Sequence, residues 1–260
     1  MALSDITPVT STGISAIPAP LPSRTDRDGK AIGSVMLLSV PDEEFLALRP
    51  VLEPVPLPRY KVLYEQGQTI EHAYFLNAGM ISLVVIASDG RSVEVGISGR
   101  EGVVGLGVVF GFDEAPTRAI VQLPGTGLRI ASATLHDNFA KLPALRRATE
   151  RYVLSQQMQL AQTAACNRLH DMEQRLARWL LMCQDTTDTG SLPLTHEFLA
   201  QMLGTGRPTV TLAAGVLERA GLIENTRGSV KILNRKRLED VACECYAAIQ
   251  SYRSGLALQY

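Results

Sequence analysis

The sequence predicts an α+β protein in which a small all-β domain is followed by a long helical segment and a C-terminal helix-turn-helix. Three observations support this class. Short apolar runs broken by glycine fill residues 61–131, residues 144–182 contain no glycine or proline, and residues 194–217 have the pattern of two helices joined by a glycine turn. The domain boundaries expected from these patterns are 1–34, 35–141, 142–170 and 171–260.

Composition limits the class of protein before any motif is considered. The 260 residues are 46% hydrophobic, which is enough for two folded domains. The apolar stretches are much shorter than the roughly 20 residues that span a bilayer, and the N-terminus lacks the pattern of a secretory signal. We therefore expect a cytoplasmic protein with no membrane partner. Because the net charge is only −1, nucleic acid could be bound only by a local basic surface.

The first segment, residues 1–34, is rich in proline, serine, threonine and alanine and has neither helical nor strand periodicity. Such a composition predicts a flexible tail. A solvated extension is favoured, and an arm that binds a partner is the alternative.

The second segment, residues 35–141, carries the signals of a small barrel or sandwich. Apolar runs at 62–64, 74–76 and 81–86 alternate with glycine at intervals typical of short strands. The sequence Ser88-Asp89-Gly90 predicts a hairpin turn, because glycine tolerates the positive φ that such turns need.

Pro143 opens the helical segment, which is too long for one ordinary helix and is expected to break near Asn167 to His170. Apolar residues recur every three or four positions and form a narrow seam. This seam packs either against the β-domain or against the same helix of a second chain, and the two-fold pairing is favoured. The segment 142–170 is therefore predicted to be a dimerisation helix. The seam residues are Leu154, Met158, Ala161 and Ala165, preceded by Leu145, Ala148 and Tyr152.

The helix-turn-helix has its own start and stop signals. Thr195 can cap the first helix, and Gly204 can take the left-handed conformation that ends it. Pro208 is tolerated only in a first turn, so the second helix should begin near Gly206 or Arg207. A generic helical hairpin is the less favoured alternative. The predicted inward face of the second helix is Val210, Ala213, Ala214 and Leu217.

The exposed start of the second helix is suited to the major groove of double-stranded DNA. Arg207 is the candidate for reading a base, because its guanidinium can bind guanine with two hydrogen bonds. Residues 222–225 and 230–233 flank the basic turn Thr226-Arg227-Gly228-Ser229, which predicts a two-stranded wing. Arg227 and Lys231 would contact phosphates. The remaining candidates for DNA contact are Thr205, Thr209 and Thr211.

From about residue 40 to 250, the chain resembles the Crp/Fnr family of transcription regulators. The order matches: a β-roll punctuated by Gly67, Gly79 and Gly90, a dimerising helix, and a winged module from about Asp171. The resemblance implies a cyclic-nucleotide-binding-like β-roll and a homodimer that binds a two-fold symmetric DNA site and contacts RNA polymerase. The alternative is a cyclic-nucleotide-binding regulatory module whose helical tail binds protein.

The chain departs from the family in the nucleotide pocket. The family's Gly-Glu-Leu-Gly stretch, whose acid holds the ribose, corresponds here to residues 102–107, which contain no acid. The family's Arg-Ser pair corresponds to Thr117-Arg118, one place later, and such a shift turns a strand side chain to the other face. The candidate pocket residues are Gly105, Gly107, Thr117 and Arg118, but the shift would turn Arg118 away from a bound phosphate. We therefore expect an effector other than cyclic AMP. The alternatives are an apolar or unidentified ligand, or a β-roll that only serves as a folded platform for the dimer helix.

The recognition helix also departs from the family. Of the family's Arg, Glu and later Arg, this chain keeps Arg207 and has Pro208 and Leu212 at the other two places. The family's consensus DNA site is therefore not assumed for this chain.

The sequence shows no catalytic grouping and no metal motif, so we expect neither an enzyme nor a cofactor or metal. The four cysteines, Cys166, Cys183, Cys243 and Cys245, contain no CxxC pair. On a single helix over 235–249, the side chains of Cys243 and Cys245 would point in different directions. Small buried hydrophobes are favoured over redox-sensing thiols.

Overall fold

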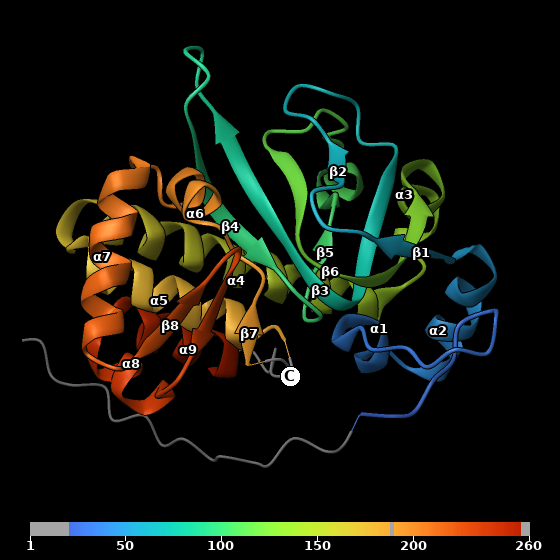
Figure 1. The fold of residues 1–260 in the computed structure, drawn as a ribbon. Helices are drawn as coiled ribbons and strands as arrows, with labels where there is room; N and C mark the ends of the chain where they lie inside the picture. The colour runs from blue at the N-terminus through green and yellow to red at the C-terminus, as the bar shows by residue number, and fades with distance from the viewer. Residues whose placement is uncertain (1–20, 188–189, 256–260) are drawn as a thin grey trace, which may run out of the picture.

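The computed structural model describes residues 21–187 and 190–255. Figure 1 shows the β-domain on one side and the winged domain on the other, with the long helix α4 behind them. Residues 1–20 of the predicted tail lie outside the described residues. In the described part of the chain, no helix is long and apolar enough to cross a membrane.

The β-domain is a six-stranded antiparallel sheet with short helices at its ends. Strands β1, β6, β3 and β4 lie side by side in that order, β2 pairs with β6, and β5 pairs with β3. The elements are α1 (Val35–Ser39), α2 (Asp42–Leu48), η1 (Arg49–Val51), β1 (Glu53–Leu57), β2 (Val62–Tyr64), β3 (His72–Ile86), β4 (Ser92–Ser98), β5 (Val103–Val104), η2 (Leu106–Phe110), β6 (Arg118–Ala131) and α3 (Ser132–Phe139).

Two runs that the sequence divides at Gly79 form one long strand, β3. Gly79 has a φ of +89°, and a Cβ there would lie 2.6 Å from the carbonyl oxygen of Leu123. The pairing of β3 with β6 shifts register on both sides of this residue. Glycine here bends a strand, because only a residue without a Cβ fits the close approach of β6.

Residues 21–34 are not a flexible tail as predicted. Arg24 is 8% exposed and donates hydrogen bonds to the carbonyl oxygens of Leu37 (2.6 Å) and Val40 (2.7 Å). Its guanidinium also pairs with Asp42 and lies over the ring of Phe45. The prediction of a flexible tail failed because Arg24 binds the carbonyl groups at the end of α1. Composition alone does not reveal such a contact.

The long helix α4 (Pro143–Leu169) is followed after a two-residue break by α5 (Met172–Gln184), which confirms the predicted break. Glu44 accepts hydrogen bonds from the free backbone N–H groups of Ala144 and Leu145 at the start of α4. The predicted seam divides between two faces. Its first part, Leu145, Ala148 and Tyr152, is buried inside the chain, whereas Leu154 and Ala161 are exposed and Met158 and Ala165 are half-buried.

The winged domain has a three-stranded sheet in the order β7-β9-β8. The predicted helix over 235–249 is divided, because Ala242 is extended (φ −62°, ψ 148°) and ends the first helix. The elements are β7 (Ser191–Leu192), α6 (His196–Leu203), α7 (Arg207–Arg219), β8 (Ile223–Thr226), β9 (Ser229–Ile232), α8 (Arg235–Val241) and α9 (Cys245–Gly255).

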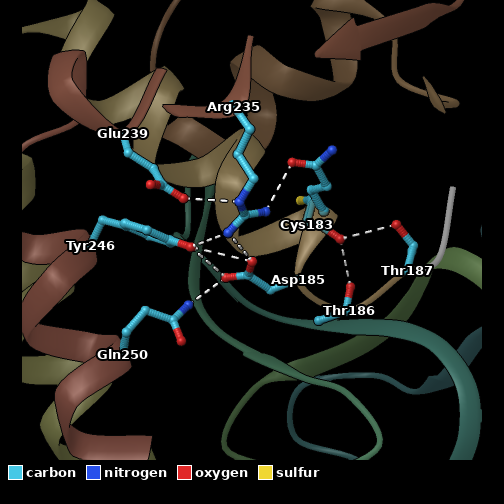
Figure 2. A network of polar contacts seen from close by, with 9 residues as sticks. Cys183, Asp185, Thr186, Thr187, Arg235, Glu239, Tyr246 and Gln250 are labelled. Carbon is cyan, nitrogen blue, oxygen red and sulfur yellow. Dashed lines mark hydrogen bonds and ion pairs between the residues drawn. The ribbon is translucent and has the colours of Figure 1, made fainter. Parts of the chain in front are cut away.

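Polar contacts around Asp185 attach the last two helices to the end of α5 (Figure 2). The guanidinium of Arg235 on α8 lies 2.6 Å from Asp185 Oδ1 and also pairs with Glu239. Tyr246 on α9 donates to Asp185 Oδ2 at 3.0 Å, and Gln250 donates to the same oxygen. One carboxylate, 12% exposed, therefore holds both helices.

The β-domain and the winged domain share an apolar core. Met80, Val84 and Ile97 of the sheet belong to the same cluster of buried residues as Trp179 on α5. The ring of Tyr60 lies 5.6 Å from that of Phe198 on α6. The two domains are therefore packed as one body.

A buried carboxyl group lies inside this shared core. Trp179 Nε1 donates to Glu94 Oε1 at 2.8 Å. The hydroxyl of Ser82 lies 2.5 Å from Glu94 Oε2 and also contacts the side-chain amide oxygen Oε1 of Gln122. The Ser82 hydroxyl has a single proton to donate. When it donates this proton to Gln122, its contact with Glu94 is a hydrogen bond only if Glu94 is protonated and donates to the Ser82 oxygen. Burial raises the pKa of Glu94 from near 4.5 to about 7.

This pKa predicts a fall in stability as the pH rises. Between about pH 4.5 and pH 7, Glu94 is protonated in the folded state and ionised in the unfolded state. The contribution of this proton to the free energy of unfolding is therefore largest below pH 4.5 and is lost as the pH rises through 7. Glu94→Gln should therefore stabilise the protein by about 2 kcal/mol at pH 8 and much less at pH 5.

Thermal unfolding of wild type and Glu94→Gln across this pH range tests the prediction. Glu224→Gln, which makes the same change at an exposed position, is the control. Destabilisation by Glu94→Gln at pH 8 would contradict the account of this network.

Candidate nucleic-acid interface

The first helix of the motif, α6, begins and ends as predicted. Thr195 Oγ1 accepts a hydrogen bond from the backbone N–H of Phe198 at 3.2 Å, and Gly204 has a φ of +61° at the C-terminal end. A Cβ on Gly204 would lie 2.9 Å from Val93 Cγ2 on β4. Glycine at this turn therefore also permits the contact between the motif and the β-domain.

The second helix, α7, begins at Arg207, after the N-cap Gly206, with Pro208 in its first turn. All four residues of the predicted inward face are buried, which confirms the orientation of the helix. Arg207, Thr209 and Leu212 are exposed, and Thr205, just before the helix, is half-buried. The start of α7 thus presents a cation and small polar groups to solvent.

The wing is also confirmed as a structure. Thr226 pairs with Ser229 across a turn made by Arg227 and Gly228, and Gly228 has a φ of +85°. Arg227 and Lys231 are exposed. The third strand, β7, pairs with β9 and was not predicted, because two residues carry too little pattern to identify a strand.

His196 is a residue of this site that the sequence reading did not single out. Its Nδ1 lies 3.1 Å from Thr211 Oγ1 and its Nε2 lies 3.4 Å from Asn225 Oδ1 on the wing. The hydroxyl of Thr211 also donates to the carbonyl oxygen of Arg207 at 3.0 Å. The polar group of Thr211 is thus occupied within the protein, and His196 joins α6, α7 and the wing.

A groove of about 910 Å³ separates the start of α7 from the β3–β4 hairpin. Thr205 and Arg207 line one wall, and Arg91 lines the other. The side chain of Arg91 is 86% exposed and pairs with Asp89 within the hairpin. The groove leaves the start of α7 accessible to solvent.

The expected effector pocket is a cavity of about 340 Å³ between the β-domain and α4. Gly105, Gly107 and Thr117 line it as expected, but Arg118 does not. Arg118 Nε lies 2.6 Å from Glu65 Oε2, an ion pair on the side of β6 where β2 lies. The assignment of Arg118 to the pocket was wrong, because the one-residue shift along the strand turns its side chain to this partner.

The pocket has an apolar lining and a floor made partly by α4, which contributes Tyr152 and Gln156. Among the described residues that line it, the only charged side chain is the acidic Glu114. Besides Tyr152, its large aromatic and aliphatic lining residues are Tyr64, Ile70, Leu83, Leu106, Phe110 and Phe112.

Backbone packing explains the two pocket glycines. Gly105 has a φ of +91°, and a Cβ there would lie 2.8 Å from the carbonyl oxygen of His72. A Cβ on Gly107 would lie 2.7 Å from the carbonyl oxygen of Phe112. Both positions require glycine whether or not a phosphate is bound.

Two family models match the chain in the order of its domains. A cyclic nucleotide-binding domain matches residues 54–141, and a Crp-like helix-turn-helix domain matches residues 174–241. The second match covers the helices and wing described above. The chain belongs to the Crp/Fnr family. It is a DNA-binding transcription regulator of that type.

Individual relatives agree with this assignment. The CRP-like cAMP-activated global transcriptional regulator of Mycobacterium tuberculosis is 24% identical in an alignment of 199 residues, which covers 74% of this chain and 89% of that protein. The structure of FixK2 from Bradyrhizobium japonicum has a TM-score of 0.64 at 16% identity and covers 74% of this chain and 98% of its own. The c-di-GMP-responsive regulator CLP of Xanthomonas campestris has a TM-score of 0.60 at 17% identity and covers 73% of this chain and 96% of its own. The two structures share the fold.

The cysteines of this Crp/Fnr protein are buried as predicted, but the convergence of three of them was not predicted. Cys166, Cys243 and Cys245 form a buried cluster, and His170 is beside them. Sequence reasoning expected no metal site, because the spacing fits no motif and one continuous helix would separate the last two cysteines. The break between α8 and α9 brings them together. Cys183 lies apart, in the shared apolar core.

Proposed function

We propose that this Crp/Fnr regulator acts as a homodimer on a two-fold symmetric DNA site, with α7 in the major groove. The observation that carries the proposal is the exposed start of α7, where Arg207 and Thr209 face solvent while the opposite face is buried. Exposed cations on the wing, Arg227 and Lys231, are suited to contact the phosphates that flank the major groove.

We also propose contact with RNA polymerase and a location in the bacterial cytoplasm, where the chromosome lies.

Sequencing of genomic fragments captured by the purified protein tests this function. A dimer should enrich an inverted repeat whose half-sites lie about 10 base pairs apart, or a multiple of that distance. No enriched sequence, together with capture of a protein partner, would instead favour a regulatory module that acts through protein contacts.

Arg207 and Arg227 should behave differently when each is replaced by alanine. Arg207→Ala should cost about 1 to 3 kcal/mol of binding free energy and relax specificity at one base pair, because a base contact is lost. Arg227→Ala should weaken specific and random DNA alike and reduce the salt dependence, because a phosphate contact is lost.

Fluorescence anisotropy with a captured site and a scrambled duplex, at several salt concentrations, measures both effects. Equal losses on the two duplexes for Arg207→Ala would contradict its role in reading a base.

The exposed face of α4 supports the homodimer. Val153, Leu154 and Leu160 are 39%, 43% and 43% exposed, which is unusual for large apolar side chains along one helix. Met158 and Ala161 follow Leu154 at spacings of four and three residues and share its face, whereas Val153 and Leu160 lie on the adjoining face, where Val153 also lines the pocket. A second copy of α4 would cover this face by a two-fold contact.

Met158→Glu combined with Ala161→Glu should weaken dimerisation, because it places like charges opposite each other at a two-fold axis. Ala133→Glu, on the exposed surface of α3, is the matched control. Sedimentation velocity measures the association. A monomeric wild type at micromolar concentration would remove the basis of the proposal.

The pocket supports an effector other than cyclic AMP. A cyclic phosphate carries a negative charge that needs a cation or several amides when it is buried. Arg118 is already paired with Glu65, and the charged lining residue Glu114 would repel a phosphate. The apolar lining is instead complementary to a small apolar ligand in contact with α4.

Titration calorimetry should therefore detect no micromolar binding of cyclic AMP or cyclic GMP. The Mycobacterium tuberculosis relative, which is named as cAMP-activated, is the positive control. Micromolar binding by the wild type that is abolished by Arg118→Ala would overturn this assignment.

A further inference from the structure

Four side chains that could bind a metal converge where the end of α4 meets the junction of α8 and α9. Cys166 Sγ, Cys243 Sγ, Cys245 Sγ and one ring nitrogen of His170 all lie within 4.8 Å of one another. The three cysteines are at most 3% exposed, and the His170 side chain is 12% exposed. The DNA-binding function described above uses none of these residues.

The spacing of the ligand atoms is close to that of a tetrahedral zinc site. With Zn–S near 2.3 Å and Zn–N near 2.0 Å, neighbouring ligand atoms lie about 3.5 to 3.8 Å apart. Cys166 Sγ lies 3.4 Å from Cys243 Sγ, and Cys245 Sγ lies 3.4 Å from His170 Nδ1. Three cysteines and one histidine form a ligand set typical of structural zinc.

The chain reaches this arrangement by two local routes. Cys166 and His170 are four residues apart at the end of α4, so their side chains leave the same side of the helix. Cys243 and Cys245 converge because the helix stops at Val241 and resumes at Cys245, with Ala242 extended between them.

Neighbouring groups orient the ligands as they do around bound zinc. His170 Nε2 lies 3.0 Å from Glu244 Oε1 and Nδ1 faces Cys245 Sγ, so a neutral ring that donates Nε2–H to the carboxylate would present the Nδ1 lone pair to a metal. Gln162 Nε2 donates to Cys245 Sγ at 3.1 Å, a contact suited to a thiolate. The carboxylate orients the His170 ring, and the amide donor favours the thiolate form of Cys245.

The surrounding charge is complementary to a thiolate site. Three thiolates and one Zn²⁺ leave a net charge of −1. Arg178, 3% exposed, interacts electrostatically with Cys166, and Arg175 interacts with Cys166 and Cys243. In the described part of the chain, the Nε groups of both arginines lack a hydrogen-bond partner. A buried and a half-buried cation, each with an unsatisfied donor, indicate that this region is built to face negative charge.

We propose that Cys166, His170, Cys243 and Cys245 bind one zinc ion that fastens the end of α4 to the α8–α9 junction. The ion replaces the thiol protons and is held by three Zn–S bonds and one Zn–N bond, with no change in oxidation state. It fixes the exit of the predicted dimerisation helix against the C-terminal helices of the DNA-binding domain.

Metal analysis of the purified full-length protein, made under reducing conditions, is the first test. About one zinc per chain is expected in the wild type. The ion should be released when a mercurial reagent titrates the thiols, and this readout requires no variant. After chelation, added Co²⁺ should give the visible and near-ultraviolet bands of a tetrahedral thiolate site.

Variants assign the ligands. Cys166→Ser and Cys243→Ser should lower the zinc content to near zero and abolish the cobalt bands. Cys183→Ser, which removes a buried cysteine outside the cluster, is the matched control and should keep both. Circular dichroism verifies that each variant is folded.

Several results would overturn the proposal. These are a wild type that lacks zinc and gives no cobalt bands, iron with acid-labile sulfide in place of zinc, and a disulfide between Cys166 and Cys243 in the reduced preparation. Equal zinc loss in Cys183→Ser and Cys166→Ser would also overturn it. If the variants do not fold, zinc release from the wild type still decides the matter.

Discussion

The indole of Trp179 donates a hydrogen bond to the buried carboxyl of Glu94, and around this contact the β-domain and the winged domain close one apolar core. A carboxyl group in this position is costly unless each of its polar atoms has a partner. Ser82 and Trp179 supply those partners from two different domains. The orientation of the winged domain on the sheet therefore depends on a polar contact that is satisfied only when the domains are docked.

This docking creates a continuous set of contacts between the pocket and the recognition helix. The pocket touches α4 at Tyr152 and Gln156, and these two residues hydrogen-bond to Ser98 and to the carbonyl oxygen of Ile97 on β4. The same strand carries Glu94 and packs against the turn before α7. A ligand that moves α4 would therefore act on β4 and, through it, on the start of α7.

The features predicted correctly from the sequence are those with local causes. The cap at Thr195, the left-handed Gly204 and the first-turn Pro208 each follow from the needs of one helix end, so the helix-turn-helix was predicted almost to the residue. The inward face of α7 followed from helical periodicity. The family assignment depended on these same signals.

The features that the sequence did not reveal depend on contacts between distant segments. Arg24 is ordered by carbonyl groups at the end of a short helix, and Arg118 is turned to Glu65 by strand register. The cysteine cluster joins residues about 77 positions apart. It also depends on a helix break at Ala242, where the sequence has no glycine or proline that would predict a break. Nothing in the local pattern at these positions encodes the partner.

The docking of the two domains can be measured directly, because Trp179 is the only tryptophan of the chain. Urea unfolding should be followed in parallel by tryptophan emission and by far-ultraviolet circular dichroism. If the domains share one core, the indole becomes solvated in the same transition in which the secondary structure is lost, and the two curves coincide. An emission shift to that of solvated indole at a lower urea concentration, with the circular dichroism unchanged, would contradict the account.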